Sequence, residues 1–196
     1  MRTLRYGFFG EDAAQREFLV AYLDWRAREE LSLQFEAVAY FGKQFGPMNN
    51  LVVDRRCFDA CREAFELGHP RLDWLFIGRD VDSFELARHQ FLTDALRQKI
   101  PTKWHGRTLL LLPVQCAEHW LLYLTNYPRR DPLETQPKDY AKQRVYQDFA
   151  QPRVAIRTAL LAILDTARIE WLTEVSVSFR AFHQQVDSYV AALPNS

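Results

Sequence analysis

Short apolar runs alternate with segments of helical spacing over the first two thirds of the chain. The apolar runs predict strands over residues 4–10, 33–40, 72–78 and 108–112. The run 72–78 is apolar at nearly every position, which is typical of a strand buried on both faces of a parallel sheet. We therefore expect an α/β fold with a doubly wound, mostly parallel sheet and helices on both of its faces.

Apolar residues at helical spacing fill the segments between and after these strands. Gly68-His69-Pro70 should end one helix, Ser176 or Ser178 should cap the last one, and residues 101–107 should form a polar turn. The expected helices lie around residues 18–23 and over residues 57–67, 84–98, 117–124, 154–167 and 179–193.

The domain organisation follows from the length and from one change in composition. At 196 residues the chain is long enough for one domain of ordinary size. Residues 126–137 are polar and proline-rich, which indicates an exposed excursion or a mobile loop. We expect a single domain over residues 1–196, with an α/β core over 1–125 and a loop and helical C-terminal part over 126–196.

The charge balance and the apolar runs narrow the function classes. Lys and Arg total 25 and Asp and Glu total 25, so no bulk basic excess marks a nucleic-acid binder, although a local basic face remains open. The longest apolar runs are far shorter than the roughly 20 residues that span a bilayer. The chain start lacks a secretory signal and the three cysteines form no framework of pairs, so we expect a cytoplasmic protein that has no membrane partner.

Acidic residues follow two of the expected strands. Glu11 comes directly after the first strand, and Asp80 and Asp82 follow the central one. Ligands of open parallel sheets bind beyond the carboxyl ends of the strands, so these acids should meet at one edge. If the central strand continued through Asp82, its two carboxylates would point to the same side and converge on one ion. Oxygen ligands without a neighbouring Cys or His set favour Mg²⁺ over zinc.

Each of these acids also has a purely structural interpretation. Asp80 and Asp82 could belong to a polar turn in which Asp82 or Ser83 caps the next helix. Glu11 could simply favour a helix dipole, and Glu118 is an ordinary acid for a first helical turn. The basic residues around 129–130 and 140–144 could form a nucleic-acid face or a solvated helix face.

The order of the short motifs resembles a known family. The Toprim domain of topoisomerases, primases and overcoming-lysogenization-defect nucleases has a strand-end acid followed by a helix and, later, an Asp-x-Asp. Small Toprim-like proteins of bacterial defence systems, including the RloB-like group, are more similar still. The matching residues here are Glu11 before a helix, Asp80-Val81-Asp82, Pro113 with Glu118-His119-Trp120, and Ser176-Val177-Ser178-Phe179. The chain departs from that pattern at Asp12, where the relatives have Gly, and at Gln15, where they often have an acid; Asp12 or Glu17 could substitute as ligand.

The resemblance implies Mg²⁺-dependent (or Mn²⁺-dependent) hydrolysis of phosphodiester bonds in DNA or RNA. Asp80 and Asp82 would hold the metal, Glu11 would be a ligand or the base that activates water, and Glu118 would complete the site. Arg79, with Lys142 or Arg144, would bind the phosphate. The resemblance also implies a role in antiphage defence and control by an ATPase partner. The alternative is a non-catalytic Toprim-like interaction or effector subunit of a defence complex.

Overall fold

The four strands form one all-parallel sheet. The computed structural model describes residues 1–148 and 154–193. The strands are β1 (Arg2–Gly10), β2 (Leu33–Ala37), β3 (Trp74–Gly78) and β4 (Thr108–Leu111), in the spatial order β2-β1-β3-β4. The register aligns Gly10 of β1 with Gly78 of β3, and Gly78 with Leu111 of β4. The strand order changes direction at β1, which confirms the doubly wound α/β fold.

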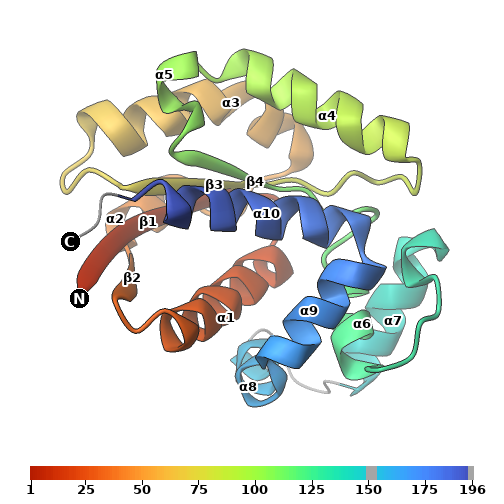
Figure 1. Ribbon diagram of the computed structural model, residues 1–196. Helices are drawn as coiled ribbons and strands as arrows, with labels where there is room; N and C mark the ends of the chain where they lie inside the picture. The colour runs from red at the N-terminus through yellow and green to blue at the C-terminus, as the bar shows by residue number, and fades with distance from the viewer. Residues whose placement is uncertain (149–153, 194–196) are drawn as a thin grey trace.

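Helices cover both faces of this sheet (Figure 1). α3, α4 and α5 lie on one side, α1 and α10 lie on the other, and α6, α7 and α9 lie beyond the end at which the strands finish. None of the described helices has the length and apolar character needed to cross a membrane. The bounds are α1 Ala13–Glu29, α2 Ala39–Gln44, α3 Asn50–Arg62, α4 Leu86–Lys99, α5 Thr102–His105, α6 Glu118–Thr125, α7 Lys138–Asp148, α8 Val154–Ile163, α9 Thr166–Val175 and α10 Val177–Ala191, with a π turn η1 at Glu63–Leu67 and a 3-10 turn η2 at Leu133–Thr135.

The sheet separates two hydrophobic cores. Successive residues of a strand point to opposite faces, so Phe76 enters one core and Ile77 enters the other. The core under α1 and α10 is rich in aromatic rings, and Trp120 packs edge-on against Phe179 at a centroid distance of 5.4 Å. The other core contains two of the three cysteines. All three cysteines are buried and free.

Several elements differ from the sequence-based prediction because tertiary packing decides short segments. The strand expected over 33–40 ends at Ala37, where its register with β1 ends, and α2 then buries Phe41. The polar turn expected over 101–107 contains α5, which buries Trp104. The helix expected over 154–167 ends at Ile163, because Asp165 caps a new helix, α9, by accepting a hydrogen bond from the Arg168 amide.

The segment expected to be exposed or mobile is anchored through η2. Residues 128–132 are exposed, but Glu134 of η2 accepts hydrogen bonds from the hydroxyls of Ser176 and Ser178, each at 2.6 Å. Ser176 also caps α10 by accepting from the Phe179 amide at 3.0 Å, as predicted, and Trp120 donates to Ser178 at 2.9 Å. The Ser-x-Ser-Phe motif thus fixes the loop that leads into α7.

Gly78 is required by close packing at the end of β3. A Cβ atom there would lie 2.3 Å from Gln15 Oε1 and 2.7 Å from the Phe8 ring. We expect Gly78→Ala to lower the free energy of unfolding by about 1–3 kcal/mol, measured by urea unfolding, because the core must shift to admit the methyl group. Gly106→Ala is the matched control, since nothing lies within 4 Å of its added Cβ. Equal stability of the two variants would contradict this account.

Candidate functional site at the carboxyl edge of the sheet

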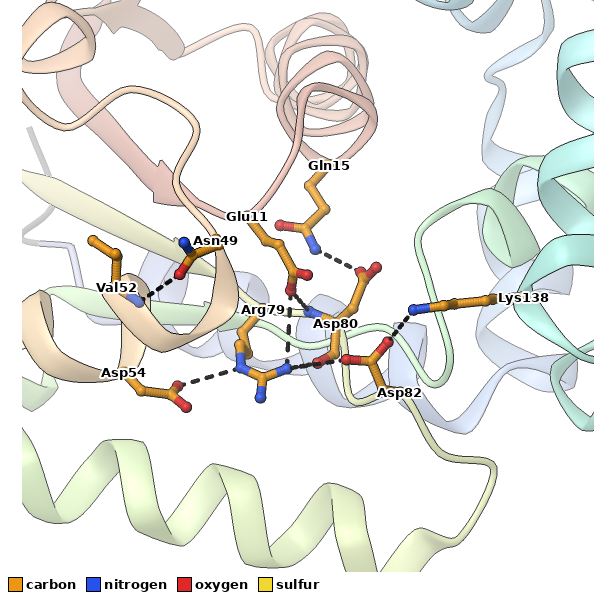
Figure 2. Close-up of polar contacts among 9 residues, drawn as sticks. All are labelled: Glu11, Gln15, Asn49, Val52, Asp54, Arg79, Asp80, Asp82 and Lys138. Atoms are coloured by element: carbon orange, nitrogen blue, oxygen red, sulfur yellow. Dashed lines mark hydrogen bonds and ion pairs between the residues drawn. The ribbon is translucent and has the colours of Figure 1, made fainter.

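The predicted acids meet at the topological switch point of the sheet. β1 pairs with β2 on one side and with β3 on the other, so the chain leaves the crevice in opposite directions after these strands. Glu11 follows β1, and Arg79 and Asp80 follow β3. Figure 2 shows these three side chains gathered with Asp82, with Gln15 approaching from α1 above and Lys138 reaching Asp82 from the right of the view. The structure therefore brings together the two strand ends that the sequence singled out.

Asp80 lies at the buried centre of this group. Its side chain is 3% exposed, and its Oδ1 accepts a hydrogen bond from Gln15 Nε2 at 2.6 Å. Its backbone amide donates to Glu11 Oε2 at 3.1 Å. Burial raises the pKa of the Asp80 carboxyl well above its ordinary value, and the charges of Asp12 and Glu11 raise it further. The fold thus holds an acid where its ionised form is disfavoured.

Asp82 takes a different direction from Asp80, which corrects the expectation that the two carboxylates share one side. β3 ends at Gly78, and Asp82 has a positive φ of 54°, so no extended strand runs through both residues. Its Oδ1 accepts from Lys138 Nζ at 2.7 Å, while Asp80 faces Gln15 (Figure 2). The N-cap of α4 is Glu85, so neither Asp82 nor Ser83 stands at the cap position, but Ser83 Oγ accepts a hydrogen bond from the Glu85 amide at 3.1 Å, just before the helix begins.

Arg79 holds the acids in place through a buried guanidinium. Its Nε lies 3.3 Å from Asp54 Oδ1, and its Nη1 lies 3.9 Å from Glu11 Oε2 and 3.6 Å from Asp82 Oδ2. Nη1 also donates to the backbone carbonyl of Asp80. With its side chain 9% exposed and these donors directed at protein oxygens, Arg79 is a positioning residue. The phosphate contact expected of Arg79 stays a prediction.

Two buried oxygen atoms of the site have no hydrogen-bond partner. Glu118, in the first turn of α6, is fully buried; its Oε1 accepts from Tyr146 Oη at 2.8 Å and its Oε2 has no partner. Gln15 is likewise fully buried, and its Oε1 has no partner. Buried acceptors in folded proteins are nearly always paired, so these two are open positions for a cation or a water molecule. Sequence reasoning missed Gln15, having treated it only as a departure from the family pattern.

Asp12 and Glu17, the suggested substitutes for a missing ligand, have separate roles. Asp12 caps α1 by accepting from the Gln15 amide at 2.9 Å. Burial raises the pKa of Asp12, and the charge of Glu118 adds to this effect, so Asp12 is electrostatically part of the site. Glu17 instead pairs with Arg16 at 2.9 Å. Of the two, only Asp12 interacts with the acidic group.

One face of α7 covers the acids with cations and a phenol. Lys138, Lys142 and Tyr146 are spaced four residues apart, which places them on one side of the helix. Lys138 binds Asp82, and Tyr146 donates to Glu118. Burial of Lys142 would lower its pKa, but the charge of Glu118 and other nearby acids outweighs this and raises it. Lys138 and Tyr146 are therefore site residues in addition to Lys142. No local motif marks them, but their four-residue spacing from Lys142 could have indicated them.

The basic face considered for residues 129–130 and 140–144 is not assembled as one surface. The Arg144 guanidinium stacks over the ring of Tyr140 at 4.6 Å. Arg130 pairs with Glu174 at 2.6 Å. Lys142 lies close enough to Glu118, Asp80 and Asp12 for their charges to raise its pKa. These contacts fit a solvated helix face with one inward cation.

The donor set suits a hard cation by its chemistry. It consists of carboxylate oxygens with the two unpartnered oxygens of Gln15 and Glu118, and Mg²⁺ binds such ligands while keeping several waters. As the side chains now stand, no group of three or more His, Cys, Asp or Glu residues within the described part of the chain is arranged to hold one ion. Binding would therefore require the carboxylates to reorient, with Lys138 releasing Asp82.

Comparison of the chain with protein-family models, curated proteins and solved structures finds no match. The Toprim resemblance accordingly remains a prediction from the motifs, and the site is interpreted from its own geometry.

The raised pKa of Asp80 predicts a pH-dependent gain in stability when its charge is removed. Folding destabilises the ionised carboxylate, so the protein loses stability as the pH rises from the ordinary value of 3.8 through the raised pKa. We expect Asp80→Asn, which keeps an acceptor for Gln15, to raise the melting temperature at neutral pH by about 2–4 °C per kcal/mol of relieved burial cost and repulsion. Thermal unfolding at neutral pH and at about pH 3 would measure this gain in melting temperature. The gain should vanish at about pH 3, where the Asp80 carboxyl is protonated in both the folded and the unfolded state.

The exposed Asp94, which accepts from Gln90 at 2.9 Å, offers the control Asp94→Asn. Its melting temperature should match the wild type at both pH values. A destabilised Asp80→Asn at neutral pH would contradict the assigned repulsion.

Proposed function

We propose that this chain is a Mg²⁺-dependent nuclease that hydrolyses phosphodiester bonds at the switch-point site. The observation that carries the proposal is the burial of Asp80 beside Glu11, Asp12 and Glu118, at the place where open α/β sheets bind ligands. Grouping acids at low exposure costs stability, and such groups with raised pKa values concentrate at functional sites. The unpartnered oxygens of Gln15 and Glu118 add ligand capacity at the same place.

The acids have separable roles in this chemistry. Asp80 and Asp82 would hold the metal, with Glu118 completing or orienting its surroundings. Bound Mg²⁺ supplies stabilisation of the charge on the scissile phosphate and on the leaving oxygen. Burial raises the pKa of Glu11, and this effect exceeds the lowering effect of the hydrogen bond from the Asp80 amide. The raised pKa is closer to the range suited to a general base that activates water.

The cations of α7 would supply the phosphate contacts. Lys138 and Lys142 now neutralise the acids, and a divalent cation bound by those acids would free both ammonium groups for phosphate oxygens. This inward placement is compatible with the zero net charge of the chain, because the substrate would contact Lys138 and Lys142 at the site itself. The Toprim resemblance extends this proposal in three ways. It implies that the substrate is DNA or RNA, that the protein acts in antiphage defence, and that an ATPase partner controls its activity.

One observation favours a second candidate, a non-catalytic interaction or effector subunit of a defence complex. The two lysines satisfy much of the acidic charge without a metal, and the described acids do not form a ready three-ligand group. In that function the lysine-acid contacts would simply join α7 to the sheet. The two candidates differ in their response to divalent metal.

A cleavage assay on plasmid DNA, single-stranded DNA and tRNA tests the nuclease proposal. With Mg²⁺ or Mn²⁺ the wild type should cleave at least one substrate, and Asp80→Ala should reduce the rate by at least about a hundredfold, because it removes a central metal ligand. Asp94→Ala, an exposed acid on α4, should retain the wild-type rate. Circular dichroism of each variant would establish that it is folded.

Metal binding itself provides the second readout. A divalent cation that binds only the folded state raises the melting temperature by mass action, and Asp80→Ala should abolish that rise. A rise without cleavage would favour a nuclease that requires its partner. No cleavage together with no melting shift would overturn the nuclease proposal in favour of the interaction subunit.

A further inference from the structure

A pocket lies directly beside the acidic site and shares residues with it. Its volume is about 340 Å³, which falls within the range of small-ligand sites. Asp82 and Lys138 belong to the acidic site, and the remaining lining residues are Phe84, Gln115, Thr135, Pro137 and Asp139. The walls come from the loop after β3, the loop after β4 and the segment that enters α7. Any polymer bound at the acids could therefore place its next group in this pocket.

Phe84 gives the pocket an apolar wall that is open to solvent. Its side chain is 60% exposed, although it is a large aromatic residue. Beside it the pocket offers an amide from Gln115 and the ammonium of Lys138, which binds Asp82 in this structure and would be freed by a cation bound to the acids. An aromatic face next to a hydrogen-bonding amide and a phosphate-binding cation is the combination that holds one base of a single strand.

We infer that this pocket binds an unpaired nucleobase of the substrate, so that the proposed nuclease acts on single-stranded or locally unpaired nucleic acid. The inference rests on the proposed function and specifies its substrate class. Lys138 would contact the backbone, Phe84 would stack on the base, and Gln115 would meet its polar edge. Bases inside a duplex have both faces covered by their neighbours, so a stacking wall selects against intact duplex.

Binding to a fluorescently labelled single-stranded oligonucleotide, followed by anisotropy, tests the subsite independently of cleavage. Measurements in EDTA and again with Ca²⁺ cover the metal-free and metal-bound states. We expect Phe84→Ala to weaken single-strand binding by about tenfold or more, because one stacked base is lost, and Phe84→Trp to retain it. Binding to a blunt duplex of the same sequence should not change with Phe84→Ala.

Phe91 provides a matched control, since it is 61% exposed on α4 and lies outside the pocket lining. Phe91→Ala should bind the single strand like the wild type. Lys138→Ala should weaken single-strand and duplex binding alike, because a phosphate contact does not read the base. Equal effects of Phe84→Ala and Phe91→Ala, or no single-strand binding in either buffer, would overturn the subsite.

The outcomes also separate the subsite from the nuclease proposal. If the protein cleaves in a metal-dependent way but Phe84→Ala does not change its single-strand binding, the nuclease proposal stands and the subsite is wrong. Phe84-dependent single-strand binding without cleavage or a metal-induced melting shift would support the subsite and remove the nuclease.

Discussion

The buried guanidinium of Arg79 is the interaction on which the carboxyl edge of the sheet depends. It joins Asp54 of α3, Glu11 after β1 and Asp82 of the following loop, which are three segments far apart in the chain. Without a cation at this position, these carboxylates would repel one another in a poorly solvated crevice. The strand end that carries Asp80 is therefore fixed by charge as well as by the sheet.

This acidic edge is sustained by two hydrophobic cores that contribute most of the folding free energy. The ring cluster under α1 and α10 includes Trp120 of α6, the helix whose first turn carries Glu118. The glutamate-serine anchor of η2 then positions α7 over the acids from the other side. The site thus sits on rigid elements, while the unfavourable burial of Asp80 is offset elsewhere in the structure. Separation of this kind is expected where a functional site opposes local stability.

The four strands and their parallel arrangement could be predicted from the sequence, because continuous apolar runs and glycine or proline boundaries are local signals. It also placed Glu11 and Asp80 at one edge, since parallel strands must end together. It could not predict that Gln15 binds Asp80, that Lys138 binds Asp82 or that Tyr146 binds Glu118, because each pair joins distant segments. The four-residue spacing on α7 was visible, but only packing decides which helix face turns inward. α2 and α5 were missed for the same reason.

Under the proposed function, the placement of positive charge would reconcile a neutral chain with a polyanionic substrate. A diffuse basic surface would attract nucleic acid everywhere, whereas here Lys138 and Lys142 are held by the acids at the crevice. Under the proposed function, a divalent cation would replace two ammonium charges among the carboxylates, and those ammonium groups would then be available to phosphate. Metal binding and substrate binding would in this way be coupled through one helix face. Because this coupling works by exchange of cations, it needs no net positive charge on the protein.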